Sequence, residues 1–192
     1  MIEGLTNIDF YKDRYDKELQ IKLHISTQVR LPITILSLLF AGAFYLIKEY
    51  SSILLNSNKL ALRVFILFQS LILVGFFLMA IINLIKMYDN GFKKYKYLPL
   101  SNVFYEREKI IFDEYSSKFK NIDALNDDEY KNAVLEYSKK YFQTELVEYY
   151  VECSSHNQKL NEKRFKYYYA SRRLIFVCLG ILIILWATLI NI

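Results

Sequence analysis

The chain of 192 residues contains few residues that break or cross-link a fold: 5 Gly, 2 Pro, 2 Cys and 2 His. Residues 100–179 contain neither glycine nor proline, which favours long helices over a sheet with tight turns. Cys153 and Cys178 lack metal-ligand spacing, and His24 and His156 are far apart in the sequence. The sequence therefore predicts neither a disulfide nor a histidine-rich metal site.

Catalytic motifs are also missing. The sequence has no nucleophile elbow, no zinc-protease motif, no glycine-rich phosphate loop and no aspartate-rich metal motif. Carboxylates are plentiful in the central part of the chain, but none form a recognisable catalytic pair. We therefore expect a protein that is not an enzyme and that uses no cofactor or metal.

Apolar residues are abundant, at 54% of the chain, while charged residues make up an average 23%. Three stretches carry no formal charge: residues 31–47, 64–85 and 174–190. A transmembrane helix needs about 20 apolar residues, with about 17 as the lower limit. Basic and aromatic residues at the ends of these stretches suit a membrane interface. The sequence predicts three transmembrane helices.

The basic residues predict the orientation of these helices. The side that includes the N-terminus and the long central loop carries most of them, whereas the opposite side carries only Lys48, Lys59 and Arg63. Cytoplasmic loops are enriched in Lys and Arg. We therefore expect a multi-pass membrane protein whose N-terminus and central domain are cytoplasmic and whose C-terminus is on the opposite side.

The predicted fold class is an all-α membrane protein with three transmembrane helices, an amphipathic N-terminal helix and a helical cytoplasmic domain. The predicted segments are a cytoplasmic amphipathic helix (1–30), a two-span hairpin (31–87), a helical cytoplasmic domain (88–172) and a third transmembrane helix (173–192).

One face of the N-terminal helix is apolar at spacings of three and four residues. This face consists of Ile8, Tyr11, Tyr15, Leu19 and Leu23. Because five acidic residues occur in the first 30 positions, the helix is poorly suited to a lipid surface. We expect it to pack on protein.

The central loop is long enough for two or three helices. The first begins after Pro99, with Ser101 or Asn102 as its cap, and a turn follows at residues 121–128.

The second helix is predicted to have Asp127 or Asp128 as its cap and Glu129 in its first turn, where acidic residues favour the helix dipole. If it continued to the end of the third apolar stretch, it would be about 90 Å long. We therefore expect a bend near residues 153–157.

Charge is segregated along the central loop. Residues 113–152 contain ten acidic and five basic residues, whereas residues 153–173 contain six basic residues and one acidic residue. This pattern has two explanations: anchoring at the cytoplasmic face with contact to anionic lipid, or a site for a nucleotide or oligonucleotide whose bases stack on interleaved tyrosines. The candidate ligand-binding residues are Lys93, Lys94, Lys96, Arg107, Lys109, Asn157, Asn161, Arg164, Arg172 and Arg173.

Asn157, Asn161, Arg164 and Tyr168 share one stripe of the predicted helix. Two amides and a guanidinium on one stripe form either a hydrogen-bonded seam with another helix or a site for an anion.

The second apolar stretch contains Gln69, Ser70 and Asn83. Polar groups at bilayer depth face protein or water. They indicate either contacts within one helical bundle or a water-filled pore formed by several copies. No stretch carries an ionisable residue at mid-depth, which disfavours proton-driven transport.

This layout, with the segments "YKYLPLSNVFYEREKIIFDEY" and "NQKLNEKR", resembles small membrane effectors of bacterial antiphage systems. These include SLATT-type effectors and the effector partners of nucleotidyltransferases in CBASS-like and Hailong-type systems. The resemblance implies a homo-oligomeric channel or membrane-disrupting effector of the inner membrane, gated by a nucleotide or oligonucleotide signal. It also implies that Asn157, Asn161, Arg164 and the basic cluster couple a ligand to the spans. The alternative is a non-conducting membrane scaffold or immunity protein that binds a protein partner.

Overall fold

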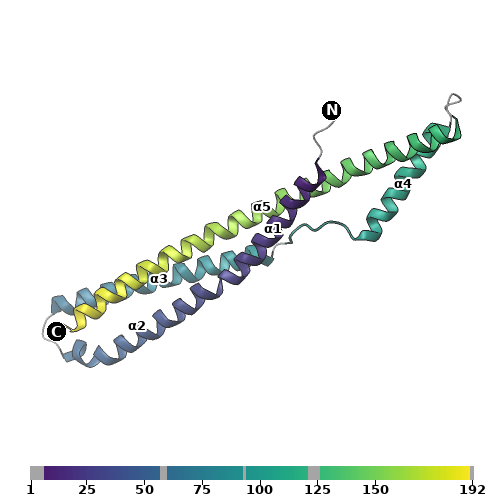
Figure 1. Cartoon of the computed structure of the whole chain (residues 1–192). Helices are drawn as coiled ribbons and strands as arrows, with labels where there is room; N and C mark the ends of the chain where they lie inside the picture. Colours follow the sequence, from purple (N-terminus) through teal and green to yellow (C-terminus); the bar gives the residue numbers. More distant parts are fainter. Residues whose placement is uncertain (1–6, 57–59, 93, 121–125, 191–192) are drawn as a thin grey trace. The chain divides into compact units, whose positions relative to one another are not determined.

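The structure is a computed structural model, which describes residues 7–56, 60–92, 94–120 and 126–190. All regular structure in these ranges is helical (Figure 1). The helices are α1 (Ile8–Gln28), α2 (Arg30–Asn56), α3 (Leu60–Phe92), α4 (Ser101–Lys120) and α5 (Asp127–Ile190).

Three helical stretches are long and apolar enough to cross a membrane. They lie within Ile8–Lys48, Leu60–Asn90 and Asp127–Ile190. The prediction of a helical chain with three apolar helices of spanning length is confirmed.

Pro32 explains why α1 and α2 are separate helices. Proline has no backbone N–H, so Pro32 cannot donate to the carbonyl of Gln28, four residues earlier. The helix is interrupted at Val29 alone, and Ile33 N–H then reaches the Val29 carbonyl oxygen at 3.4 Å. Proline is tolerated in the first turn of α2 because an N–H there has no helical partner.

The chain divides into two compact units. Unit 1 consists of Met1–Gln20 and Tyr95–Lys159, and unit 2 consists of Ile21–Lys94 and Leu160–Ile192. Helices α1 and α5 each contribute residues to both units. The four segments inferred from the sequence divide the chain differently, and that division stays a prediction.

In unit 1, the start of α1 packs on α5. Tyr15 lies in a cluster with Tyr150 and Cys153, and the apolar residues around them are Ile8, Tyr11, Leu19, Leu98 and Leu146. This confirms that the N-terminal helix packs on protein. Leu23, which we expected on the same face, is 65% exposed. The prediction was wrong for Leu23 because the buried positions of α1 are residues 15, 18 and 25.

Helix α4 packs on the first half of α5 through buried apolar and aromatic residues. Ile111 of α4 and Val134 of α5 are almost completely buried. Tyr115 stacks on Tyr137 with ring centroids 6.3 Å apart, and the Tyr130 hydroxyl donates to the Ser116 carbonyl oxygen at 3.0 Å. These contacts make α4 and this part of α5 a helical hairpin.

The helix starts differ from the predicted caps by one residue. The Leu100 carbonyl accepts the N–H groups of Val103 and Phe104, so Leu100 occupies the cap position of α4 instead of Ser101 or Asn102. Asn126 caps α5, because its Oδ1 accepts the Glu129 N–H at 2.9 Å and Glu129 Oε2 accepts the Asn126 N–H at 3.2 Å.

Glu129 lies in the first turn of α5, as predicted. Of the turn expected at residues 121–128, positions 121–125 lie outside the described residues.

The predicted bend near residues 153–157 is absent, and α5 is one helix of 64 residues. The Ser154 hydroxyl donates to the Val151 carbonyl oxygen at 3.2 Å within the helix, so this serine does not interrupt it. The buried side chains also recur every seven residues, at positions 150, 157, 164, 171, 178 and 185. Such a repeat keeps one face of a helix buried along its length.

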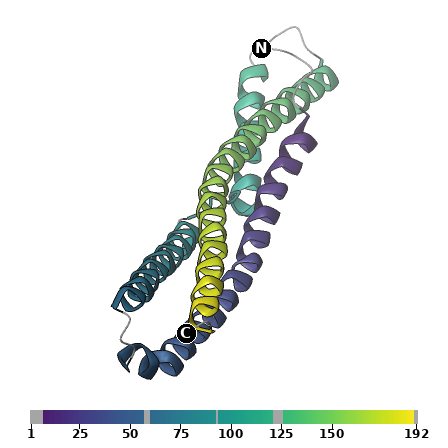
Figure 2. The ribbon, with the colours of Figure 1, turned by 90° about the vertical axis from the view of Figure 1, so that its left-hand side faces the viewer.

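In unit 2, α2, α3 and the C-terminal half of α5 run side by side (Figure 2). Their shared core includes Leu36 and Leu39 of α2, Leu73 and Ala80 of α3, and Cys178 of α5. The Ser171 hydroxyl, fully buried, donates to the Ala80 carbonyl oxygen at 3.1 Å and joins α5 to α3. Most large apolar side chains of α2 and α3 nevertheless face outward.

Candidate functional site

The two units differ in charge. Unit 1 contains 17 acidic and 12 basic residues, whereas unit 2 contains 3 acidic and 13 basic residues. Phosphate groups are therefore favoured electrostatically at unit 2 and disfavoured at unit 1. This difference separates the predicted ligand-binding residues into two groups.

In unit 1, Lys96 faces protein groups. Its ammonium forms an ion pair with Glu152, and this hydrogen bond raises the pKa of Lys96 and lowers the pKa of Glu152. Its backbone N–H donates to Asn157 Oδ1, and its carbonyl oxygen accepts from Asn157 Nδ2, both at 2.9 Å. The amide of Asn157 therefore clamps the segment before α4 to α5.

Arg107 forms a two-pronged ion pair with Glu145. Its Nε and Nη2 atoms lie 2.9 and 2.6 Å from the two carboxylate oxygens. Hydrogen bonding to Arg107 lowers the pKa of Glu145. A groove of about 370 Å³ beside this pair is lined by Arg107, Tyr149 and three carboxylates, Glu145, Glu148 and Glu152. This acid-rich setting suits a cationic group better than a phosphate.

The stripe Asn157, Asn161, Arg164 and Tyr168 is buried, with exposed fractions of 0, 2, 4 and 6%. Within unit 2, Arg164 Nη2 donates to the Ser26 hydroxyl at 3.1 Å. Of the two interpretations of the stripe, the contacts of Asn157 and Arg164 are those of a hydrogen-bonded seam. A ligand-coupling role of these residues stays a prediction.

The other predicted ligand-binding residues are scattered. Lys94, Lys109 and Arg173 are exposed, and Lys93 lies outside the described residues. Arg172 is also exposed, but its guanidinium lies 5.6 Å from the centroid of the Tyr168 ring. Arg172 lines a small pocket that the sequence did not predict, together with His24 and Gln28 of α1.

The polar residues of α3 occupy three different settings. Asn83 Nδ2 donates to the Met79 carbonyl oxygen, one turn earlier in the same helix. Ser70 lines an apolar pocket between α2 and α3. The Oε1 atom of Gln69 is buried and has no hydrogen-bond partner among the described residues. Asn83 therefore has one hydrogen bond within its own helix, whereas the buried Gln69 oxygen has none among the described residues.

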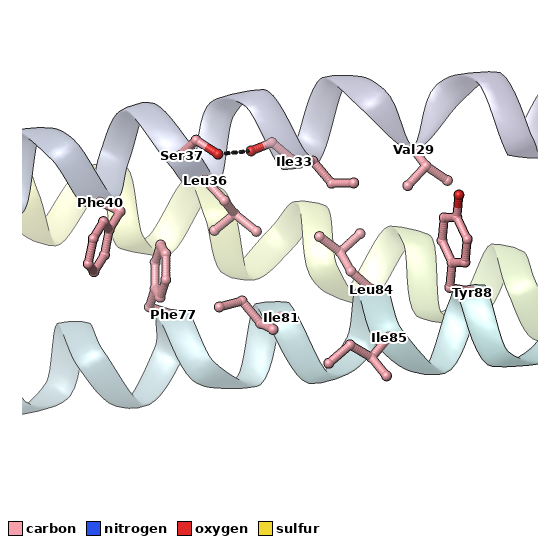
Figure 3. A pocket seen from close by; sticks show the side chains of 10 residues that line it. All are labelled: Val29, Ile33, Leu36, Ser37, Phe40, Phe77, Ile81, Leu84, Ile85 and Tyr88. Carbon is pink, nitrogen blue, oxygen red and sulfur yellow. Dashed lines mark hydrogen bonds between the residues drawn. The ribbon is translucent and has the colours of Figure 1, made fainter.

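An apolar groove of about 570 Å³ lies between α2 and α3. Figure 3 shows the side chains of both helices directed into it, with Phe40 and Phe77 at one end and Val29 and Tyr88 at the other. The Ser37 hydroxyl bonds to the Ile33 carbonyl oxygen at 3.0 Å, so the groove is lined almost entirely by hydrocarbon (Figure 3).

A second apolar pocket, of about 390 Å³, shares Phe40, Phe77 and Ile81 with this groove. The sequence did not predict either pocket, because apolar residues occur on every side of each predicted span.

Two observations on the described residues concern metal binding and thiol reactivity. No group of three or more His, Cys, Asp or Glu side chains in this part of the chain could hold a metal ion. Cys153 is buried, and its burial raises the pKa of the thiol, which disfavours the reactive thiolate.

Comparisons of the chain with protein-family models, with curated proteins and with solved structures find no match.

Proposed function

We propose that the protein is a multi-pass inner-membrane protein that assembles into a homo-oligomeric channel or membrane-disrupting effector, gated through its helices outside the membrane. Three apolar helices of spanning length support membrane insertion. Only about a fifth of the residues in their apolar windows are buried. In water the remaining apolar surface would be exposed, whereas lipid or further copies of the chain would cover it.

The observation that carries the proposal is the continuity of α5. The helix contributes Glu145 and Asn157 to the hydrogen-bonded contacts of unit 1, and Cys178 and Leu185 to the apolar core of unit 2. No loop intervenes between these contacts. A ligand or partner that moves the first half of α5 therefore acts on the same helix that would cross the membrane.

Assembly of several copies has a matching surface. The groove between α2 and α3 has apolar walls and the dimensions to accept side chains of a neighbouring helix. Within a bilayer, helices associate by close packing because lipid tails are as apolar as the side chains. A groove left open to lipid loses those packing contacts, and a helix of a second copy would restore them.

The distribution of basic residues in unit 2 supports an orientation with the N-terminus and central domain in the cytoplasm and the C-terminus opposite, because only Lys48, Lys59 and Arg63 of its 13 basic residues lie between the first two apolar stretches. The resemblance to antiphage membrane effectors adds defence against phage as the biological setting and a nucleotide or oligonucleotide as the signal. An adjacent nucleotidyltransferase gene would support this setting.

The test is the membrane potential of bacterial cells that express the protein from an inducible promoter, read with a potential-sensitive dye. We expect depolarisation, either on expression or when a nucleotide signal is supplied. The Ser37→Trp variant places an indole ring in the groove and should prevent depolarisation. It should also prevent chemical cross-linking of copies of the chain in the membrane. Leu38→Trp is the matched control, because Leu38 is an outward-facing neighbour that does not line the groove.

A second test addresses the polar groups of α3. Gln69→Leu should change the conducted current if the buried amide borders a pore. Unchanged potential and growth in every condition, with the protein present in the membrane, would contradict the proposed function.

The acidic surface of unit 1 favours the alternative function, a membrane scaffold or immunity protein that conducts nothing. The groove lined by Glu145, Glu148 and Glu152 suits a basic segment of a partner protein. Recovery of a stoichiometric partner with a monomer of this chain, and loss of that partner in Glu148→Lys, would support the alternative.

A further inference from the structure

The small pocket beside Arg172 is lined by polar and aromatic side chains of α1 and α5. It measures about 150 Å³ and lies between the end of α1 and the part of α5 that precedes the third apolar stretch. Its lining consists of His24, Ile25, Gln28, Phe165, Tyr168, Tyr169 and Arg172. The lining includes a guanidinium, an imidazole and an amide but no carboxylate.

The cation in this pocket is held in place by aromatic contacts. The guanidinium of Arg172 lies over the ring of Tyr168, and the Tyr168 hydroxyl donates to Gln28 Oε1 at 3.4 Å. Tyr168 also packs edge-on against Tyr169, and Phe165 stacks on Tyr169 with ring planes 19° apart. A guanidinium carries several N–H donors in one plane, and this fork matches two oxygens of a phosphate.

The volume and the charge of the pocket agree with a phosphate group. The pocket, at about 150 Å³, has room for a tetrahedral oxyanion together with water. Unit 2 carries 13 basic and 3 acidic residues, so no excess of carboxylates opposes an anion here. A glutamine amide also brings two N–H donors to the second wall.

The position of the pocket in the sequence indicates where the phosphate comes from. Gln28 lies three residues before the apolar stretch 31–47, and Arg172 lies two residues before the apolar stretch 174–190. If both stretches begin at the membrane surface, as the proposed function requires, the pocket lies at the depth of the lipid headgroups. A free nucleotide would have to reach the same depth from solution.

We propose that His24, Gln28 and Arg172 form a binding site for the phosphate of an anionic phospholipid headgroup. Arg172 binds two phosphate oxygens, and the amide of Gln28 donates from the opposite helix. The site joins α1 to α5 at the point where each helix leads into an apolar stretch. The proposed site rests on the proposed membrane insertion, but it does not require that the protein conducts ions.

The test is native mass spectrometry of the full-length protein in a neutral detergent, titrated with short-chain phosphatidylglycerol. Diacylglycerol of the same chain length lacks the phosphate, and adenosine monophosphate and inorganic phosphate lack the acyl chains. We expect saturable binding of phosphatidylglycerol and much weaker binding of the other three probes.

Arg172→Gln should raise the apparent Kd for phosphatidylglycerol about tenfold, which corresponds to the loss of one charge-assisted hydrogen-bonded contact. Arg173→Gln is the matched control, because it removes the same charge at an exposed neighbour that does not line the pocket. It should change Kd by less than about twofold. Gln28→Leu tests the opposite wall and should weaken binding, and Arg172→Lys should restore part of it.

Equal losses in Arg172→Gln and Arg173→Gln would overturn the site in favour of general surface charge. Binding of adenosine monophosphate that exceeds that of phosphatidylglycerol and depends on Arg172 would overturn the assignment to lipid. Carbonate extraction of membranes tests the proposed function separately. If the protein resists extraction but phosphatidylglycerol binding ignores Arg172, the site alone is wrong; if the protein is extracted, membrane insertion is wrong.

Discussion

Unit 1 and unit 2 are both built from long helices, but the polar side chains of the two units have different settings. In unit 1, polar side chains tie together segments far apart in the chain, as Asn157 does with Lys96 and Arg107 does with Glu145. In unit 2, apolar side chains form the core, and single polar contacts such as Ser171 with Ala80 are placed within it. The charges follow the same division, acidic in unit 1 and basic in unit 2.

One unbroken helix, α5, contributes to both units. Helix α5 presents the same seven-residue repeat of buried positions in both units, but the residues at these positions differ. A buried polar group stabilises the fold when it is hydrogen-bonded to other groups of the protein. Within lipid, a helix contact gains little from apolar burial, so packing and a few hydrogen bonds decide it.

The largest effect should come from making the same amide-to-leucine change in each unit. Asn157→Leu removes the partners of both backbone groups of Lys96, and we expect a loss of about 1 to 3 kcal/mol. Asn83→Leu removes only a bond within α3, and we expect a change within about 0.5 kcal/mol. Hydrogen exchange of the segment before α4 measures the first change and exchange of α3 the second.

Equal protection of the segment before α4 in Asn157→Leu and in the unsubstituted protein would contradict the clamp. Asn157→Asp sharpens the test, because it keeps the acceptor for the Lys96 N–H and removes the donor to the Lys96 carbonyl.

A smaller effect, dependent on pH, is expected at the ion pair of unit 1. The pKa of Glu145 is lowered in the folded protein, so the pair adds stability above the unfolded pKa of a glutamate and loses it as pH falls through the lowered value. At pH 7, Glu145→Gln should therefore melt at a lower temperature than the unsubstituted protein. The difference should shrink on acidification below pH about 4.3 and vanish once Glu145 is protonated.

Circular dichroism melts in detergent between pH 3 and 7 measure this difference. Glu148→Gln is the control, because Glu148 lines the same groove and the ion pair is formed by Glu145. A difference between the Glu145→Gln and unsubstituted proteins that stayed constant across this pH range would exclude the ion pair as its cause.

The smallest effect is expected from a single hydroxyl in unit 2. Ser171→Ala removes the bond from α5 to the Ala80 carbonyl, and interhelical hydrogen bonds in membranes are worth about 0.6 kcal/mol on average. Ser37→Ala removes a bond within α2 and should cost less. Unfolding in mixed micelles with increasing dodecyl sulfate compares the two, and a larger loss in Ser37→Ala would argue against the α3–α5 contact.

Several features of the fold could be predicted because they depend on neighbours in the sequence. The helical class and the three apolar helices follow from composition and periodicity, and the packing of Tyr15 follows from its apolar stripe. The cap positions were missed by one residue because Asn126 and Asp127 are both good caps and only hydrogen-bond geometry separates them. The predicted bend was wrong because it rested on the length of the helix and on no local signal for a break.

The candidate sites depended on residues that are distant in sequence. A polar stripe that includes Asn157 and Arg164 was visible, but its partners Lys96 and Ser26 lie 61 and 138 residues away. The pocket of Arg172 and His24 was invisible for the same reason, since each residue alone is one charge or one imidazole beside an apolar stretch.

The sequence by itself determined that the chain is helical, that its apolar residues form three blocks and that its charges are segregated, because these properties are sums over local residues. The tertiary structure decided which polar groups are hydrogen-bonded within the protein. It also decided that Arg172 lines a pocket and that α5 continues without a bend. Those outcomes depend on which helix faces are brought together, and hydrogen bonds and pockets exist only where two such faces meet.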